Sequence, residues 1–358
     1  MAKPLKIIIF PGSLGGGGVG VAFRNLCNAF DSLGHNITVI SLLPAPASRH
    51  PQAGVCYTEL NISRGILSLP VLVKTFRDLK PNVIYTAHEH LFIWVFLALR
   101  ITGLRSKICL IHTVHNHLPS EWSYANIKKR SALLLFNRLC GQADCLLSPA
   151  RIPHIQRAKQ HAVIPNIVTV KKTTLTIKPS ETKMIVAAGR LVKQKNYDLL
   201  IRAFAQIVPR CDAKLMLIGE GPERKNLIAR VLELNLEKHV QFIGQIDEPH
   251  VHLSNADLVV SSSNWEGFGM TIAEALCLSV PVVATDCPVG PSDFLTIGKG
   301  IKLVPQNNTK QLAKAMLEYL QQPPIVKKEA FQSAFSAEKI ALQHIELIQS
   351  LTVSNKPE

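Results

Sequence analysis

The sequence predicts an α/β protein with two doubly wound parallel sheets. Short apolar runs rich in β-branched residues alternate with helical patterns along most of the 358 residues. The alternation stops once, at a polar stretch rich in Thr and Lys over 169–182, and then resumes. A chain of this length suffices for two ordinary domains, so we expect one sheet before this stretch and one after it.

The first domain is expected over residues 1–168. It begins with a strand, a glycine-rich loop, a helix that Gly34 ends and a second strand, over 6–10, 11–20, 21–33 and 36–42. This order is typical of the start of a parallel α/β sheet. Further strands, with helices between them, are predicted over 83–87, 107–114 and 145–148.

The second domain is expected over residues 183–335, after a linker over 169–182. Its strands are short and apolar, as strands buried on both faces of a sheet should be. They are predicted over 183–188, 214–219, 240–244, 257–261 and 281–285, with helices over 197–208 and 224–234. Residues 336–358 form a closing amphipathic helix and tail, which we expect to pack back on the first domain.

Composition limits the class of protein. Hydrophobic residues make up 47% of the chain and charged residues 18%, which excludes a wholly disordered chain. The longest apolar run, over 91–99, is far shorter than the roughly 20 residues of a membrane span. The eight cysteines include no Cys-x-x-Cys pair, so we expect neither a zinc finger nor a disulfide framework, and a cytoplasmic location.

The positive charge is concentrated in the first half. Residues 1–170 carry 18 basic and 6 acidic side chains, whereas the remainder carries 22 and 19. Anionic partners should therefore meet the first domain. The chain has no zinc module, recognition-helix pattern or alternation of aromatic and basic residues, so nucleic acid is not the expected partner.

A glycine-rich loop follows the first predicted strand. Gly15-x-Gly17-x-x-Gly20 matches the dinucleotide fingerprint, in which glycines let the backbone approach a phosphate closely. The fingerprint also requires an acidic residue at the end of the second strand, and 36–44 contains none. An NAD-dependent oxidoreductase or epimerase is one hypothesis from this loop. A flexible loop that forms one wall of a cleft is another.

Charged residues follow two predicted strands of the second domain. Arg190 and Lys195 come after the strand 183–188, and Glu266 comes after the strand 257–261. In a doubly wound sheet, loops at the carboxyl ends of strands face the ligand crevice. Arg and Lys there can hold an anion. Glu274 stands eight residues after Glu266, inside the helix that a Gly-Phe-Gly turn opens, and can accept two hydroxyl hydrogen bonds from a ribose.

These motifs resemble the retaining family-4 glycosyltransferases (group 1) of the GT-B fold, especially those of bacterial cell-surface polysaccharide and lipopolysaccharide synthesis. The resemblance is strong over about 183–320 and weaker before it. It rests on Arg190 to Lys195, on the pair Glu266 and Glu274, and on the surrounding motifs 218–222, 242–244, 281–284 and 286–291. In the first half, Gly17, Gly18 and 34–35 match the family's opening.

The resemblance implies two Rossmann-like domains that face each other across a cleft, the first on the acceptor side and the second binding a nucleotide-sugar donor. Arg190 and Lys195 would hold the donor's diphosphate, and Glu274 its ribose. Glu266 and the backbone amides of Phe268 to Met270 would orient the transferred sugar. The donor-binding set also includes Gly17, Gly18, Gly267 and Gly269. The family retains anomeric configuration and needs no metal ion or other cofactor, since Arg and Lys neutralise the leaving group.

Histidines follow the predicted strand 107–114. In the family, a histidine at this place lies against the transferred sugar, and His115 matches it best, with His112 and His117 as alternatives. His115 could hydrogen-bond a sugar hydroxyl or stabilise charge at the reacting carbon, so we name His115 and Glu266 as catalytic candidates. His88 and His90 lack the further ligands of a metal site, and no metal ligands are predicted.

Residues 124–140 mix Lys128, Lys129, Arg130 and Arg138 with the apolar run 133–136. This pattern suits either a peripheral encounter with an anionic membrane or a core helix with a solvated end. The expected function is hexosyl transfer from a nucleotide-diphosphate sugar, UDP-hexose or UDP-N-acetylhexosamine by family habit. The acceptor would be a lipid-linked glycan or lipopolysaccharide, met at the inner face of the cytoplasmic membrane. The alternatives are the NAD-dependent enzyme and a non-catalytic nucleotide-sugar or glycan-binding module.

Overall fold

The computed structural model describes residues 3–115, 118–124, 127–152, 159–170, 182–247 and 249–354. The chain divides into two compact units. Unit 1 is Met1–Ile167 together with Ser336–Glu358, and unit 2 is Val168–Phe335. Most of the predicted linker, over 171–181, lies outside the described residues, as do the last four residues of the predicted tail.

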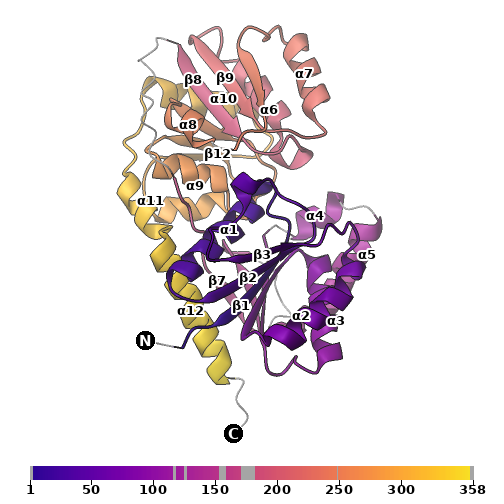
Figure 1. The fold of residues 1–358 in the computed structure, drawn as a ribbon. Coiled ribbons are helices and arrows are strands. Elements are labelled where there is room, and N and C mark those ends of the chain that lie inside the picture. The colour runs from indigo at the N-terminus through magenta and orange to yellow at the C-terminus, as the bar shows by residue number, and fades with distance from the viewer. Residues whose placement is uncertain are drawn as a thin grey trace. The chain divides into compact units, whose positions relative to one another are not determined.

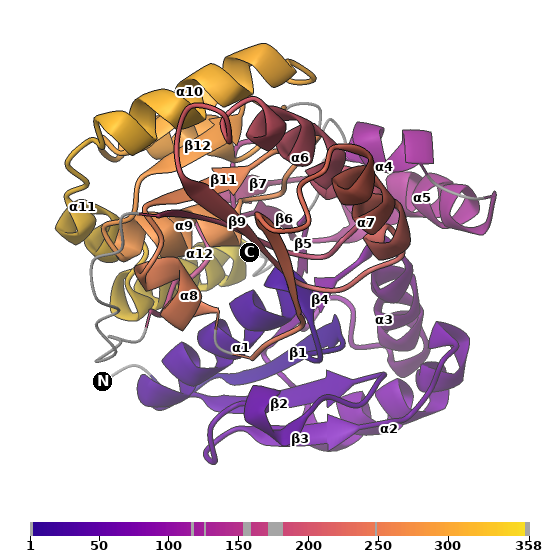
Figure 2. The ribbon, with the colours of Figure 1, turned by 90° about the horizontal axis from the view of Figure 1, so that it is seen from above.

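Unit 1 contains a seven-stranded parallel sheet. Its order is β3-β2-β1-β4-β5-β6-β7, and Figure 2 shows β1, β2 and β3 side by side. The chain therefore starts in the middle of the sheet and winds outward in both directions, as in a Rossmann fold. The strands are β1 (Lys6–Gly12), β2 (Asn36–Ser41), β3 (Cys56–Glu59), β4 (Val83–Ala87), β5 (Cys109–Thr113), β6 (Cys145–Ser148) and β7 (His161–Val163).

Helices cover both faces of this sheet (Figure 1). Alternate residues of β1 explain why: Ile7 and Ile9 pack in one apolar cluster, and Ile8 and Phe10 pack in another. The first cluster includes α1 (Gly17–Ser32) and α12 (Ala337–Ser354). The second includes α2 (Leu69–Leu79), α3 (Glu89–Thr102) and α5 (Ile127–Leu139), and α4 (Leu118–Tyr124) precedes α5. A parallel sheet needs apolar side chains on both faces because both are buried.

Unit 2 repeats the winding with six parallel strands. Its order is β10-β9-β8-β11-β12-β13. The strands are β8 (Lys183–Ala188), β9 (Ala213–Ile218), β10 (Val240–Gly244), β11 (Leu258–Ser261), β12 (Val282–Thr285) and β13 (Ile301–Val304). The helices are α6 (Tyr197–Ala205), α7 (Arg224–Glu233), α8 (His250–Ser254), α9 (Met270–Cys277), α10 (Thr309–Gln321) and α11 (Lys328–Ala334).

Five short 3₁₀ turns complete the described elements: η1 (Ala47–Arg49), η2 (Gly65–Ser68), η3 (Cys140–Gln142), η4 (Lys193–Lys195) and η5 (Pro291–Thr296). Helix α12 returns the chain to unit 1. Its Ile340 and Ile348 are buried in the unit 1 core, and its His344 forms a 3.0 Å hydrogen bond with the hydroxyl of Tyr85 on β4.

The structure corrects the predicted start of the first helix. We expected a glycine loop up to residue 20, but α1 begins at Gly17. Gly20, near the start of this helix, packs closely against the preceding loop: a Cβ there would lie 3.0 Å from the carbonyl oxygen of Leu14. Gly17 and Gly18 therefore belong to the first turn of a helix rather than to an extended loop.

Among the described residues, no helix combines the length and the apolar character that crossing a membrane would require.

Candidate active site

The charged residues of unit 2 lie where its sheet reverses direction. Strands β8 and β11 are neighbours in the sheet, yet the chain leaves them toward opposite edges. In open α/β sheets this switch point, outside the carboxyl ends of the strands, is where ligands bind. The segment 189–196 follows β8, and the segment 262–269 follows β11. The topology thus brings together Lys195 and Glu266, which are 71 residues apart in the sequence.

Lys195 and Glu266 form the centre of this site. Lys195 Nζ lies 2.6 Å from Glu266 Oε1, and the Ser263 hydroxyl donates a 2.6 Å hydrogen bond to the same oxygen. The Glu266 side chain is 7% exposed and that of Lys195 is 23% exposed. Ser262 fixes the lysine's backbone by donating to the Lys195 carbonyl oxygen at 2.8 Å. The ammonium group therefore balances a buried carboxylate and still reaches solvent.

A cavity in unit 2 opens beside this pair. Its lining includes Lys195, Glu266, Gly269, Thr271 and Tyr197. The Tyr197 side chain is buried, and both its burial and the Glu266 carboxylate raise the pKa of its hydroxyl. The other lining residues are Ala188, Val260, Ser261, Ser262, Ser263 and Ile272.

Close backbone packing holds the loop that carries Arg190. A Cβ at Gly219, whose φ is +136°, would collide with the carbonyl oxygen of Gly189, and one at Gly221 would collide with that of Leu191. The glycines at the end of β9 are therefore needed for the two loops to approach each other. Arg190 itself is exposed. It does not line the cavity around Lys195.

The Gly-Phe-Gly turn is fixed by burial. Phe268 packs against the rings of Phe294 and Phe335, with centroids 5.3 and 5.4 Å away. Gly290 is essential to this packing, because a Cβ there would lie 2.6 Å from the Phe268 carbonyl oxygen. Gly269, at φ +93°, then starts α9. Gly267 is buried, Met270 is the first residue of α9, and Phe268 acts as an apolar anchor rather than as part of the cavity lining.

Glu274 occupies a separate position on α9. It is 8% exposed, and its Oε1 lies 3.6 Å from Nε2 of His250, the first residue of α8. It does not line the cavity around Lys195, although Gly269 at the start of the same helix does. The structure therefore joins Lys195 to Glu266 directly, and it places Glu274 against a histidine that the sequence did not indicate.

His115 lies in unit 1, beyond the carboxyl end of β5. Its Nε2 is 2.9 Å from the Thr113 hydroxyl oxygen, and that hydroxyl donates to the Thr86 carbonyl oxygen, also at 2.9 Å. A hydroxyl has one hydrogen, so His115 Nε2 must be the donor to Thr113. The Nδ1 atom of a neutral His115 is then an acceptor. Burial, reinforced by His88, lowers the pKa of His115 to about 3.

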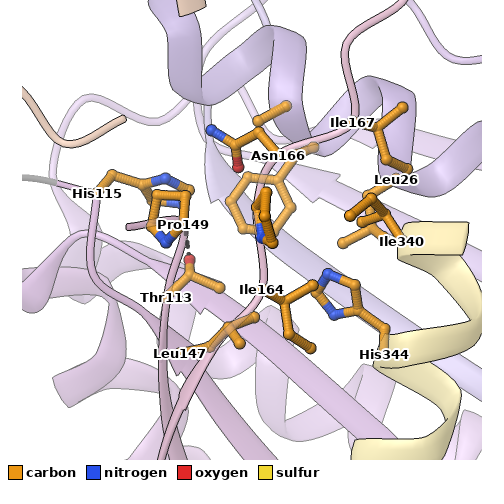
Figure 3. Close-up of a pocket in the computed structure, with 13 residues that line it drawn as sticks. Leu26, Thr113, His115, Leu147, Pro149, Ile164, Asn166, Ile167, Ile340 and His344 are labelled. Atoms are coloured by element: carbon orange, nitrogen blue, oxygen red, sulfur yellow. Dashed lines mark hydrogen bonds between the residues drawn. The ribbon is translucent and has the colours of Figure 1, made fainter. Parts of the chain in front are cut away.

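A mainly apolar pocket adjoins His115 (Figure 3). It is lined by the ends of β5 and β6, by the segment 164–167, by α1 and by Ile340 and His344 of α12. Figure 3 shows His115 beside Pro149, with its hydrogen bond to Thr113. His115 thus faces a concave surface of unit 1.

The other histidines named from the sequence differ from His115. His112 has no exposed surface, packs between the rings of Phe92 and Phe136 and is bonded to the Thr86 hydroxyl, so it is a core residue. His117 lies outside the described residues. His88 and His90 stack with centroids 5.9 Å apart. Within the described part of the chain, no group of three or more His, Cys, Asp or Glu residues could hold a metal ion.

The dinucleotide hypothesis lacks its second element in the structure as well. Strand β2 ends at Ser41, whose hydroxyl donates to the Leu43 carbonyl oxygen at 2.6 Å, and the described residues 42–44 that follow it include no carboxylate. Gly17 and Gly18 belong to unit 1, whereas Arg190, Lys195, Glu266 and Glu274 belong to unit 2.

Comparison with protein families decides between these hypotheses. The family model described as Glycosyltransferase Family 4 matches residues 16–152, and that described as Glycosyl transferases group 1 matches residues 174–334. The chain belongs to the family-4 glycosyltransferases. The two matches cover unit 1 and unit 2 in turn, which accounts for both sheets.

Curated relatives agree with this family. An uncharacterized glycosyltransferase of Methanocaldococcus jannaschii is 27% identical over 245 residues, 63% of this chain and 60% of the relative. The N-acetylgalactosamine-N,N'-diacetylbacillosaminyl-diphospho-undecaprenol 4-alpha-N-acetylgalactosaminyltransferase of Campylobacter jejuni is 35% identical over 139 residues, 38% of each chain. The alignments thus span 60% and 38% of the length of these relatives.

Solved structures establish the GT-B fold of this glycosyltransferase. Sucrose-phosphate synthase from Thermosynechococcus elongatus has a TM-score of 0.80 at 23% identity, over 97% of this chain and 99% of that one. The Anabaena protein HepE in complex with UDP-glucose has a TM-score of 0.78 at 20% identity, over 97% and 100%. Two Rossmann-like sheets of the same winding, one in each unit, are the expected form of this fold.

Proposed function

We propose that this glycosyltransferase moves a hexose or N-acetylhexosamine from a UDP-sugar to a lipid-linked glycan or a lipopolysaccharide-type acceptor. The transfer retains anomeric configuration and uses no metal ion. The observation that carries the proposal is the Lys195–Glu266 pair, set beside a cavity at the switch point of unit 2. The UDP-glucose bound by the Anabaena protein and the lipid-linked acceptor in the Campylobacter enzyme's name support the donor and acceptor classes.

The leaving group of such a reaction is a nucleoside diphosphate, on which negative charge grows as the glycosidic bond breaks. Arg190 and Lys195 would neutralise this charge, as Arg and Lys do in other phosphate sites. In the structure Lys195 already has a partner in Glu266. The diphosphate would share the ammonium group with Glu266, and so bring the glutamate close to the sugar attached to it.

His115 and Glu266 are the proposed groups at the reacting sugar. A histidine whose pKa is about 3 is neutral at physiological pH, so His115 would offer Nδ1 as a hydrogen-bond acceptor for a sugar hydroxyl. Glu266 and the amides of Phe268 to Met270 would orient the sugar, and Glu274 would accept hydroxyl hydrogen bonds from the ribose. Gly17 and Gly18 would add backbone amides from the start of α1.

Turnover in the presence of a chelator tests this function. The chain is incubated with UDP-hexoses and UDP-N-acetylhexosamines, an acceptor extract and EDTA, and UDP release and the anomeric proton of the product are followed. We expect UDP release that depends on the acceptor, and a product with an axial anomeric bond from a donor with an axial anomeric bond.

Lys195→Ala should abolish this UDP release. Lys193→Ala is the matched control, since Lys193 is exposed in the same turn. Release equal in wild type and Lys195→Ala would contradict the proposal.

We also propose that unit 1 meets an anionic membrane surface on the cytoplasmic side. On α4 and α5, Trp122, Ile127, Leu134 and Leu135 are exposed, with Ile127 82% exposed. The Arg130 guanidinium stacks 5.7 Å over the Trp122 ring. Lys129, Arg130 and Arg138 are exposed on the same segment, whereas Leu133 and Phe136 belong to the core. Apolar side chains flanked by cations suit the headgroup region of such a membrane.

Vesicle sedimentation tests this surface. Wild type should bind vesicles that contain phosphatidylglycerol and should bind pure phosphatidylcholine weakly. Ile127→Glu should reduce binding about tenfold, since it replaces an apolar contact with a like charge. Ile325→Glu is the matched control, because Ile325 is 84% exposed in unit 2. Equal losses in both variants would rule out this docking face.

A further inference from the structure

His250 lies against Glu274 in unit 2. It is the first residue of α8, which packs against α9. The distance from His250 Nε2 to Glu274 Oε1 is 3.6 Å, which is an electrostatic contact and longer than a formed hydrogen bond. The side chains are 18% and 11% exposed. Within the described residues, no other side chain forms a hydrogen bond or ion pair with this carboxylate.

The surroundings of Glu274 make this contact important. Its neighbours on α9, from Ile272 to Cys277, are buried apolar residues. A carboxylate in such surroundings is costly unless it has donors. It offers about four acceptor sites, and among the described side chains it has one long contact, with His250. The carboxylate is therefore placed to receive further hydroxyl donors from a ligand.

His250 is also incompletely bonded. Its Nε2 has no access to solvent and no hydrogen-bond partner among the described residues. A buried ring nitrogen without a partner costs free energy, so we expect it to form a hydrogen bond in the ligand-bound state. The Glu274 oxygen is a nearby acceptor, and a small closing movement of either side chain would form the bond.

We infer that His250 is a positioning residue for Glu274, an inference that rests on the proposed function. The imidazole Nε2–H holds one carboxylate oxygen of Glu274, and this leaves the other oxygen oriented toward the hydroxyls of the donor's ribose. His250 itself does not touch the reacting atoms. It sets how strongly the site distinguishes a ribonucleotide from a deoxyribonucleotide.

The test is a comparison of UDP with 2′-deoxy-UDP by calorimetric titration. Wild type should bind UDP roughly tenfold more tightly than the deoxy analogue, the effect of one lost hydroxyl contact to a charged acceptor. Glu274→Gln should reduce this ratio to about two. His250→Leu, which keeps an apolar side chain of similar size and removes the N–H, should reduce it similarly. His250→Gln, which restores an N–H near the Nε2 position, should keep most of it.

His252→Leu is the matched control, since His252 lies two residues further along the same short helix and the contact with Glu274 is made by His250. It should keep the wild-type ratio. The donor-saturated turnover of His250→Leu should change less than twofold while its KM for the UDP-sugar rises several-fold. Because a purely structural defect would lower both turnover and affinity, this split separates positioning from damage.

The outcomes are distinct. If His250→Leu keeps the tenfold ratio while Glu274→Gln loses it, the inference about His250 is wrong and the ribose role of Glu274 stands. If His250→Leu does not fold, His250→Gln provides the test. A ratio of UDP to 2′-deoxy-UDP affinity in His250→Gln as low as that in Glu274→Gln would contradict the inference. Failure of wild type to bind any nucleoside diphosphate would overturn the proposed function, and the role of His250 with it.

Discussion

At the residue scale, the Lys195–Glu266 pair separates binding from turnover. We expect Glu266→Gln to bind UDP at least as tightly as wild type, because loss of the carboxylate frees the ammonium group for the diphosphate. The same change should lower turnover by about 100-fold or more. Lys195→Ala should weaken UDP binding by about tenfold, in addition to abolishing turnover. Calorimetry and UDP release measure the two effects. A Glu266→Gln protein that binds as poorly as Lys195→Ala would contradict this account.

A second residue-scale prediction concerns the orientation of His115. Thr113 fixes the ring by accepting from Nε2 while it donates to Thr86. Thr113→Val removes both bonds and should lower turnover by about tenfold, whereas Thr113→Ser should keep it near the wild-type rate. Because the pKa of His115 is about 3, this histidine stays neutral between pH 6 and 8. The pH dependence of turnover over that range should therefore be the same in wild type and in His115→Gln. Equal rates for the Val and Ser variants would show that the hydroxyl is unimportant.

At the element scale, the loop after β8 depends on the glycines after β9. Gly219→Ala should displace the Gly189–Lys195 loop and destabilise unit 2 by about 3 kcal/mol or more, because the new Cβ collides with the Gly189 backbone. Gly103→Ala is the comparison: Gly103 also has positive φ, at +69°, but open space around it, so the cost should be about 1 kcal/mol. Urea unfolding measures the loss of stability in each variant. Equal losses in Gly219→Ala and Gly103→Ala would contradict the predicted collision.

The positions of the strands show how much of the fold could be predicted from the sequence. Strands buried on both faces, such as β4, β6 and β8, lie at the ranges predicted for them, because their apolar runs are continuous. The edge strands β3, β7 and β13 are not among the predicted strands. They are short and only partly buried, and none of them is a continuous apolar run. Their place in the sheet is decided by hydrogen bonds to a neighbour and not by local composition.

Part of the candidate site could also be predicted from the sequence. Lys195 and Glu266 each follow a strand, and the topology of a doubly wound sheet is enough to place both at a ligand-binding edge. That Ser263 and Lys195 share one oxygen of Glu266 follows only from the packing of two distant loops. The contact of His250 with Glu274 is of the same kind, since it joins residues on two helices and no motif contains both.

At the scale of the whole molecule, buried histidines should make unit 1 sensitive to acid. Burial lowers the pKa of His115 and His344 to about 3. The unfolded chain binds protons near pH 6.5, so stability is full above that pH and falls as the pH drops toward 4. Each such histidine should cost roughly 2 kcal/mol at pH 5.

Urea unfolding of the full chain between pH 7.5 and 4.5 measures this loss. His344→Gln should make the pH dependence shallower by about one proton, since the variant has one fewer group that is neutral only when folded. A dependence identical in wild type and His344→Gln would show that this histidine is not buried in its neutral form.

We propose that unit 2 holds a nucleoside diphosphate between the loops after β8 and β11. The most direct test is thermal unfolding with UDP, GDP, ADP and NAD, each well above its expected dissociation constant. A ligand at about 100 times that constant adds roughly 2.7 kcal/mol, a readily measured shift in the melting temperature. We predict a shift with UDP that Lys195→Ala reduces to about half, because a ligand bound tenfold more weakly adds roughly 1.4 kcal/mol at the same concentration. A shift with NAD alone would contradict the account and favour the dinucleotide hypothesis.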